Sequence, residues 1–327
     1  MHDNMLSDAV EQLLIDHATP VVTRTIERGG SPAPLWSAIQ DSGFCDALVP
    51  EGRGGAGLGL RDSFPLFEAC GRHALAVPFA QTIMARALLS EAGQEVPEGS
   101  IALATGRPPG VDVVCGASAD WVLLQEGSTM HLLDAKAAGR EALGYVAVDV
   151  RMTWPTGKRA EAKFEARHEL RVIEAVVLAG QMSGAMRHVF KQSLDYANVR
   201  QQFGRSIGKF QAIQHQLALM AEHAVAARMA AGMACAIDSP WPQPLLAAVA
   251  KARTAEAVVP LASMAHAIHG AFGITEEYDL QLHTRRLHAW RIAAGSETYW
   301  QQRIGQAALQ APEPLPEFVR QQLAPTS

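Results

Sequence analysis

The chain has 327 residues, of which 48% are hydrophobic and 19% charged, and its formal net charge is −5. These values predict a globular protein with a large core and exclude an intrinsically disordered chain. Lys and Arg are not concentrated in any segment or on any helix face, which argues against a nucleic-acid-binding protein.

Four cysteines are widely separated and form no CxxC pair, a usage typical of a reducing compartment. The N-terminal stretch contains acidic residues and lacks the apolar centre of a signal peptide. No window reaches the roughly 20 uncharged apolar residues of a membrane span. We therefore expect a cytoplasmic protein with no membrane span and no metal site.

Residues 1–98 are predicted to form an N-terminal helical domain, because apolar residues recur at helical spacing from Leu6 to about Gly93. The exception is the segment 49–57, VPEGRGGAG, whose glycines and proline predict a loop. Its glycines lack the order of a dinucleotide or P-loop motif, and no strand precedes them.

In residues 99–168 the helical periodicity gives way to short apolar runs. Short apolar runs at 112–115, 121–124 and 130–133 are separated by Gly, Ser, Asp and Pro. This pattern is typical of short strands joined by turns, so we expect a small, reduced antiparallel β-domain.

Residues 169–327 return to long helical periods and predict a C-terminal four-helix bundle, giving a mainly α protein. One helix begins near Ile173, a second follows Phe210, and an alanine-rich third covers 247–269. A last helix is expected after Ser296, whose hydroxyl suits an N-cap. Three prolines at 312, 314 and 316 then predict a loose tail.

Four segments resemble motifs of the acyl-CoA dehydrogenase family and occur in the family's order. They are the 49–57 loop, the RxxFG…FQ-like segment 199–211, the HGGxGxT…EY-like segment 269–278 and the GTSE-like turn 295–297. The resemblance covers both helical domains and implies the family's fold. It also implies flavin-dependent conversion of an acyl-CoA thioester to the trans-2-enoyl-CoA.

In that reaction a carboxylate removes the α-proton while the β-hydrogen leaves as hydride to the flavin, and hydrogen bonds stabilise the enolate-like thioester oxygen. The resemblance further implies FAD as cofactor and an electron-transfer flavoprotein as acceptor.

The catalytic base implied by the resemblance is Glu174. Many family members carry the glutamate just before the GTSE turn, but that position is Ala294 here. The isovaleryl-CoA branch places it on an earlier helix, before a run similar to 174–180, EAVVLAG. The amide of Ala294 remains available to bond the thioester oxygen. The alternatives are that Glu174 is an ordinary solvated glutamate, or that Glu297 is the base, although a helix N-terminus already accounts for Glu297.

The resemblance also assigns residues to the cofactor. Arg200 matches an arginine that holds the FAD pyrophosphate across a subunit interface, a task suited to the guanidinium fork. The other expected cofactor contacts are Phe203, Gln211, His269, Gly270, Gly273 and Ser296. Phe203 could instead belong to the core and His269 could be structural. Arg285 and Arg286 are left as either structural or close to CoA.

Departures from the family pattern concentrate in the middle of the chain. The TEPxxGSD-like and Trp-Ile-Ser/Thr segments that surround the flavin ring have no clear counterpart, and 102–106 and 116–120 keep only their outline. Ala267 and Ala271 replace a glutamine and a glycine of the HGG-like segment. A flavin site completed by a partner subunit would account for these losses.

Three interpretations remain open from the sequence. The chain is an active dehydrogenase subunit for a bulky or branched acyl-CoA, resembling one half of the α2β2 dehydrogenases of bacterial steroid side-chain degradation. Alternatively, it is a non-catalytic structural subunit of such a heteromer, or a different flavoenzyme, such as an oxidase or monooxygenase, on the same fold. A dimer and a tetramer are both compatible with the alanine-rich bundle.

Overall fold

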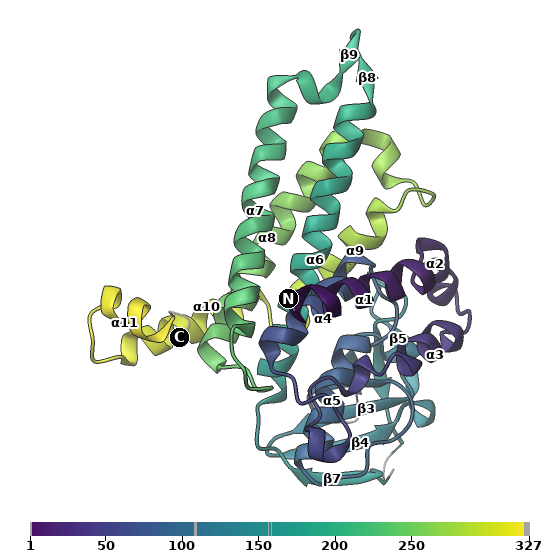
Figure 1. Ribbon diagram of the computed structural model, residues 1–327, viewed down its shortest axis with the longest axis vertical. Coiled ribbons are helices and arrows are strands. Elements are labelled where there is room, and N and C mark those ends of the chain that lie inside the picture. The colour runs from purple at the N-terminus through teal and green to yellow at the C-terminus, as the bar shows by residue number, and fades with distance from the viewer. Residues whose placement is uncertain (1, 108–109, 156, 158, 324–327) are drawn as a thin grey trace.

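The computed structural model describes residues 2–107, 110–155, 157 and 159–323. It contains an N-terminal helical part, a small β region and a long helical bundle (Figure 1). The N-terminal helices are α1 His2–His17, α2 Pro20–Glu27, α3 Ala33–Asp41, α4 Leu60–Arg72 and α5 Phe79–Glu91. The 49–57 segment is a loop with one 3₁₀ turn, Glu51–Arg53, as expected.

The N-terminal helices share one hydrophobic core with the bundle. Helix α4 crosses α6 (Leu170–Val199) so closely that only glycine fits at two points. A Cβ at Gly71 would lie 1.7 Å from the carbonyl oxygen of Gln181, and one at Gly184 would lie 1.9 Å from that of Glu68. The N-terminal part is therefore fixed on the helix that carries Glu174.

The β region consists of two small sheets. Its strands are β1 Ile101–Thr105, β2 Gly110–Val113, β3 Trp121–Glu126, β4 Thr129–Asp134, β5 Gly139–Ala142, β6 Val150–Thr153 and β7 Ala162–Glu165. One sheet has the order β1-β3-β4-β7 and the other β2-β6-β5. The β1–β3 pair is parallel, unlike the antiparallel arrangement expected, because β2 pairs in the other sheet before β3 returns beside β1.

The bundle is built from α6, α7 Gln211–Cys235, α8 Pro244–His269 and α9 Leu280–Ile292. Helix α9 was not predicted; the fourth helix was expected after Ser296 instead. A hairpin of β8 Gln201–Gln202 and β9 Arg205–Ser206 joins α6 to α7 at the far tip of the molecule (Figure 1). Buried alanines of α7 and α8 let these helices pack closely. All four cysteines are buried and free.

The segment Pro244–Ile274 is long and apolar enough to cross a membrane by length and composition, contrary to the expectation that no window would qualify. Helix α8 within it packs against α6, α7 and α10 (Glu297–Gln310), and the wholly buried Lys251 lies in its N-terminal third. These contacts identify it as the core helix of the bundle.

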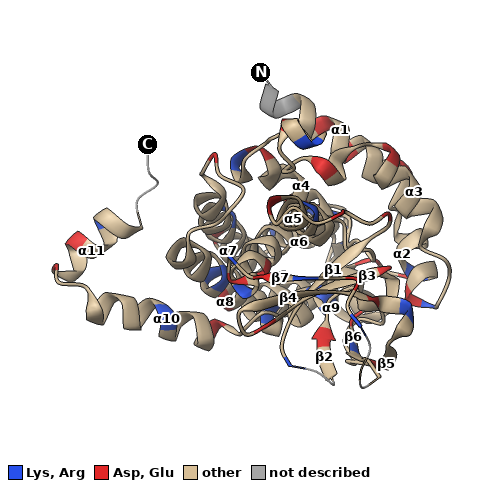
Figure 2. Cartoon of the chain, turned by 90° about the horizontal axis from the view of Figure 1, so that it is seen from below, with Lys and Arg blue, Asp and Glu red and all other residues tan. Residues whose placement is uncertain are grey.

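The C-terminal segment forms two helices that extend from the body as an arm (Figures 1 and 2). Helix α10 begins after Ser296, as expected, but the Ser296 side chain makes no capping hydrogen bond. The expected loose tail is instead helix α11, Leu315–Gln322. Pro316 lies in its first turn, where a missing N–H leaves no helical hydrogen bond unmade.

In the view of Figure 2, Lys and Arg are interspersed with Asp and Glu. Helix α9 is an exception, since it carries Arg285, Arg286 and Arg291 and no acidic residue. The described residues also contain no cluster of His, Cys, Asp and Glu able to hold a metal ion.

Candidate active site

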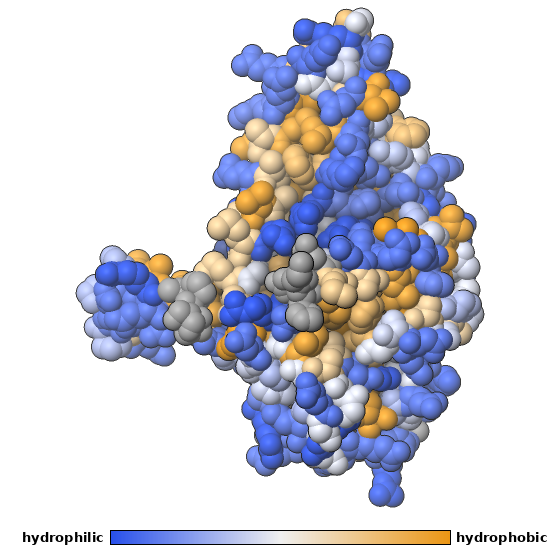
Figure 3. Space-filling model, viewed as in Figure 1, coloured by the Kyte–Doolittle hydropathy of each residue, from blue (hydrophilic) through white to orange (hydrophobic). Residues whose placement is uncertain are grey.

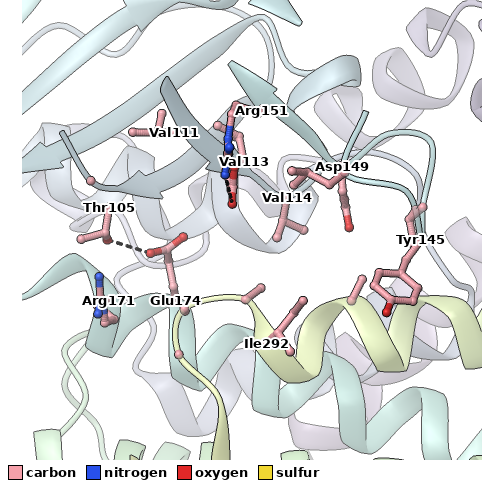
Figure 4. A pocket seen from close by; sticks show the side chains of 18 of the residues that line it. Thr105, Val111, Val113, Val114, Tyr145, Asp149, Arg151, Arg171, Glu174 and Ile292 are labelled. Atoms are coloured by element: carbon pink, nitrogen blue, oxygen red, sulfur yellow. Dashed lines mark hydrogen bonds and ion pairs between the residues drawn. The ribbon is translucent and has the colours of Figure 1, made fainter. Parts of the chain in front are cut away.

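A cavity of about 470 Å³ lies between the β region and the bundle (Figure 4). Its volume falls in the range of small-molecule sites. Its walls are formed by the end of β1, β2, the loop before β6, the start of α6 and the end of α9 with the turn that follows. The lining residues include Thr105, Gly106, Gly110, Val113, Val114, Asp149, Arg171, Glu174, Ala293, Ala294 and Gly295.

Glu174 lies on the cavity wall as the fifth residue of α6. Its Oε2 accepts a hydrogen bond of 2.9 Å from the Thr105 hydroxyl at the end of β1 (Figure 4). Desolvation by burial raises the pKa of Glu174 to about 7, although the Thr105 hydrogen bond, Arg171 and Lys251 all act to lower it. A carboxyl group with this pKa exchanges protons near neutrality, as a general base requires.

The turn between α9 and α10 forms the wall close to Glu174 (Figure 4). Ala294 has φ of 53° and Gly295 has φ of 104°, so both lie in the left-handed region. A side chain at Gly295 would also collide with Tyr299. Among the described residues, no hydrogen-bond acceptor contacts the Ala294 amide. The turn therefore has a backbone donor available beside the Glu174 carboxyl.

Two further carboxyl groups lie near the cavity. Glu297 is paired with Arg291, and this hydrogen bond lowers the pKa of Glu297, which makes it a weaker base. Asp149 lines the cavity and its Oδ1 accepts the Cys115 amide at 2.9 Å. Burial raises the pKa of Asp149 to about 6. Nothing in the sequence singled out Asp149, because its place depends on how the 143–149 loop packs.

Comparison with known families identifies the fold. Residues 2–96 match the N-terminal domain of acyl-CoA dehydrogenases, and residues 171–309 match their C-terminal domain. The chain belongs to the acyl-CoA dehydrogenase family. It is an FAD-dependent oxidoreductase, and the expected fold class is confirmed.

Relatives span nearly the whole chain. The acyl-CoA dehydrogenase IpdE2 of Mycobacterium tuberculosis is 29% identical over 295 residues, covering 87% of this chain and 90% of IpdE2. The structure of the Tcur3481-Tcur3483 steroid acyl-CoA dehydrogenase G363A variant aligns with a TM-score of 0.78 at 22% identity, covering 93% of this chain and 96% of that chain. The ChsE4-ChsE5 complex from M. tuberculosis aligns with a TM-score of 0.77 at 20% identity, covering 96% and 98%.

Three expected cofactor residues of this acyl-CoA dehydrogenase lie at the hairpin tip, far from the cavity. Arg200 caps the C-terminus of α6 and is exposed, and its side chain makes no ion pair among the described residues. Phe203 is 91% exposed, and its ring meets the Phe210 ring edge-on at a centroid distance of 6.1 Å. Gln211 is the exposed first residue of α7. Glu174 and Arg200 are 26 positions apart on α6, roughly 39 Å at 1.5 Å per residue.

A third group of expected residues lies at the C-terminal end of α8. His269 is buried, its ring stacks on Tyr196, and its Nε2 lies 3.1 Å from the Tyr278 hydroxyl. Gly270 has φ of 59° and ends the helix. A Cβ at Gly273 would lie 2.7 Å from that of His269. These contacts give all three residues a structural task, and their approach to the cofactor remains a prediction.

The residues present fit FAD in two separate places. The cavity, bordered by backbone at Gly106, Gly110 and Gly295, suits a flat ring system, and the tip offers an unpaired guanidinium and an exposed ring for a diphosphate and its neighbours. Val113 and Val114 also line the cavity. Ser296 adjoins the cavity-lining Gly295.

Arg285 and Arg286 both pair with one glutamate of the N-terminal helices. Both guanidinium groups bond Glu27 of α2, at 2.7 Å and 2.6 Å, and Arg286 is only 1% exposed. Two residues near Glu174, Thr105 and Lys251, were not predicted as site residues. Thr105 falls within the 102–106 segment that keeps the outline of a family motif, and Lys251 is a charged residue in an alanine-rich helix. Both features could have marked these residues as candidates.

Proposed function

We propose that this chain catalyses α,β-dehydrogenation of a bulky or branched acyl-CoA, of the steroid-derived kind, as one subunit of a hetero-oligomer. Glu174 is the base that removes the α-proton. The observation that carries the proposal is the Glu174 carboxyl group in a cavity where the neighbouring turn offers the free amide of Ala294. Burial raises the pKa of this carboxyl group to about 7.

The Glu174 carboxylate takes the α-proton, and the Ala294 amide donates to the thioester oxygen where negative charge develops. FAD supplies the acceptor for the β-hydride. The Thr105 hydroxyl orients the Glu174 carboxyl, because a single hydrogen bond of 2.9 Å fixes one oxygen and leaves the other free. Valines at 111, 113, 114 and 146 exclude water from the same space.

A second subunit is part of the proposal because the pyrophosphate residues cannot serve this chain's own cavity. Arg200 lies roughly 39 Å along α6 from Glu174, and its unpaired side chain faces solvent. In a two-fold arrangement the tip of one chain reaches the cavity of another. The heteromeric ChsE4-ChsE5 complex, which has a similar fold, supports this arrangement.

Exposed apolar side chains support the same conclusion. On α7, Leu219, Val225 and Met229 are 36%, 58% and 64% exposed, and we call this the α7 face. Figure 3 shows a continuous apolar surface along the upper bundle. The arm adds Leu309 and Leu315, at 88% and 63% exposure. A monomer rarely exposes this much apolar side chain, so subunit contacts best account for it.

The acyl group is inferred from the base and the relatives. A glutamate on α6 with alanine at 294 leaves the space beside the GTSE-like turn free of a long side chain. A bulky acyl group can use that space. The similar steroid acyl-CoA dehydrogenase structure and the IpdE2 relatives support a steroid-derived substrate. An electron-transfer flavoprotein is the proposed acceptor.

The test is the visible spectrum of the purified chain, alone and co-expressed with a dehydrogenase-like subunit encoded beside it. We expect bound flavin in the co-expressed complex, bleaching on addition of a steroid-derived acyl-CoA and slower bleaching with a straight-chain acyl-CoA. Flavin that no acyl-CoA reduces would contradict the proposal. Reoxidation measured with electron-transfer flavoprotein and with oxygen separates a dehydrogenase from an oxidase.

A non-catalytic structural subunit is the second candidate, because Arg200, Phe203 and Gln211 are all exposed at the hairpin tip, which supports a role in another chain's site. The two candidates differ in whose glutamate reacts. Substituting Glu174 abolishes turnover of the complex under the first and leaves it intact under the second.

A further inference from the structure

Lys251 is the one lysine of α8 and is wholly buried among alanines (0% exposed). Its neighbours Ala250 and Ala252 are buried too, so α8 presents a single ammonium group to the inside of the bundle. A buried ammonium group is unfavourable unless it is bonded or paired. Its position therefore calls for a function that an apolar residue could not fulfil.

The ammonium group bonds the backbone of the cavity turn. Lys251 Nζ donates to the carbonyl oxygens of Arg291 and Gly295, each at 2.9 Å. These two carbonyls bracket the segment 292–294, and the Trp300 indole donates to the Ala294 carbonyl at 3.1 Å. Side chains of α8 and α10 thus hold three carbonyl groups of one short turn.

The held conformation is one that the turn would not adopt unaided. Ala294 is a non-glycine residue with φ of 53°, and left-handed backbone persists only where its surroundings fix it. With the neighbouring carbonyls bonded away from the cavity, the unpartnered Ala294 amide remains as a donor on the wall beside Glu174.

Lys251 also affects the ionisation of Glu174. The groups that face it are Glu174 of α6, Glu297 of α10 and Arg291 of α9, and the groups that face Glu174 are Arg171 and Lys251. Burial lowers the pKa of Lys251 to about 7, while both glutamates oppose that change. A cation at this place favours the ionised form of Glu174, and so the form that acts as base.

We propose that Lys251 is a positioning residue of the active site: its bonds to the Arg291 and Gly295 carbonyls hold the 293–295 turn so that the Ala294 amide meets the thioester oxygen. This inference rests on the proposed function. Lys251 contacts neither substrate nor cofactor; it acts through the turn and through Glu174.

The test uses Lys251→Met in the flavin-loaded protein, co-expressed with its partner subunit where one is needed. The methionine fills the same space and removes the donor. We expect flavin reduction by acyl-CoA to slow by about 10²-fold or more, the usual effect of losing one oxyanion donor. Substrate affinity should change little. The apparent pKa of Glu174 in the pH dependence of the flavin-reduction rate should rise by about one pH unit, because a neighbouring cation is lost.

A 3-thia acyl-CoA gives a readout that does not depend on turnover. Its sulfur replaces the β-carbon, so the ligand loses its α-proton but has no hydride to transfer. We expect the parent to bind it as the anion, visible as a long-wavelength charge-transfer band with the oxidised flavin. Lys251→Met should bind it without that band until higher pH.

The matched control is Arg228→Met, which breaks the 2.9 Å ion pair with the buried Glu68 away from the cavity. It lowers stability without changing the rate or the apparent pKa of Glu174. Parent-like rate, apparent pKa and charge-transfer band in Lys251→Met would overturn the inference and leave the proposed function standing. A parent whose flavin no acyl-CoA reduces would overturn the proposed function itself.

If Lys251→Met does not fold, Trp300→Phe tests the same turn through its other support, the bond to the Ala294 carbonyl. We expect a smaller loss of rate and of the charge-transfer band. A Trp300→Phe enzyme with parent-like values for both would overturn the inference.

Discussion

The two ends of helix α6 differ in whether their site residues find partners within the chain. At the N-terminal end Glu174 is partly buried, bonded to Thr105 and faced by a turn that Lys251 and Trp300 hold. At the C-terminal end Arg200 is exposed without an ion pair among the described residues, and Phe203 is 91% exposed. One end is assembled within the chain, whereas the other offers groups that find no partner in it.

This difference shows how one helix can serve two sites. The chemistry requires fixed positions, which burial and backbone contacts supply locally. Binding of a long cofactor needs only that the groups arrive together, and a second subunit can bring them. The comparison predicts that substitutions at the first end affect rate and those at the second affect flavin retention.

The largest expected effect is on the rate. Glu174→Gln should lower flavin reduction by acyl-CoA by about 10³-fold or more, because the base is lost while the shape remains. Flavin content should not change. Rapid mixing under anaerobic conditions measures this rate. Asp149→Asn is the matched control, since it removes the other cavity carboxyl and keeps an oxygen for the Cys115 amide; a loss as large in Asp149→Asn would give that residue the role of base.

Arg200→Ala should weaken flavin retention by about tenfold or more, the value of one or two charge-assisted hydrogen bonds. The rate per bound flavin should change little. Flavin content after gel filtration measures the effect. Arg205→Ala, in the same hairpin but stacked over Phe210 at 4.3 Å, is the control. Full flavin occupancy in Arg200→Ala would remove the distinction between the two ends.

The third expected effect is on stability. The pKa of Glu174 is raised from 4.5 to about 7 by burial, so its contribution to stability is intact below pH 4.5 and falls as pH rises to about 7. Glu174→Gln should therefore be more stable than the parent at pH 8, by roughly 1–3 kcal/mol, and nearly unchanged at pH 4.5. Urea unfolding at both pH values measures it. Equal stability at pH 8 would show that Glu174 is well solvated.

Much of this architecture could be predicted from local sequence. Helical periodicity predicted the long helices of the C-terminal part. The family motifs singled out Glu174, Ala294 and Gly295, and these three residues line one cavity in the structure. The parallel β1–β3 pair could not be predicted, because strand direction follows from which sheet β2 joins. Helix α11 was missed because Pro316 was interpreted as a breaker, although it falls in a first turn.

The contacts around the base were harder to predict. Thr105 reaches Glu174 across 69 positions, and Lys251 reaches Gly295 across 44. Such pairs depend on how the β region and α8 pack on α6, which a local pattern does not contain. Asp149 carried no signal for the same reason.

The measurement that most directly tests Glu174 as the base is the pH dependence of flavin reduction in a single turnover, from pH 5.5 to 9. The account predicts a rate that rises tenfold per pH unit and levels off at an apparent pKa of about 7, with the rise abolished in Glu174→Gln and retained in Asp149→Asn. A rise that persists in Glu174→Gln would contradict it and assign the proton to another group.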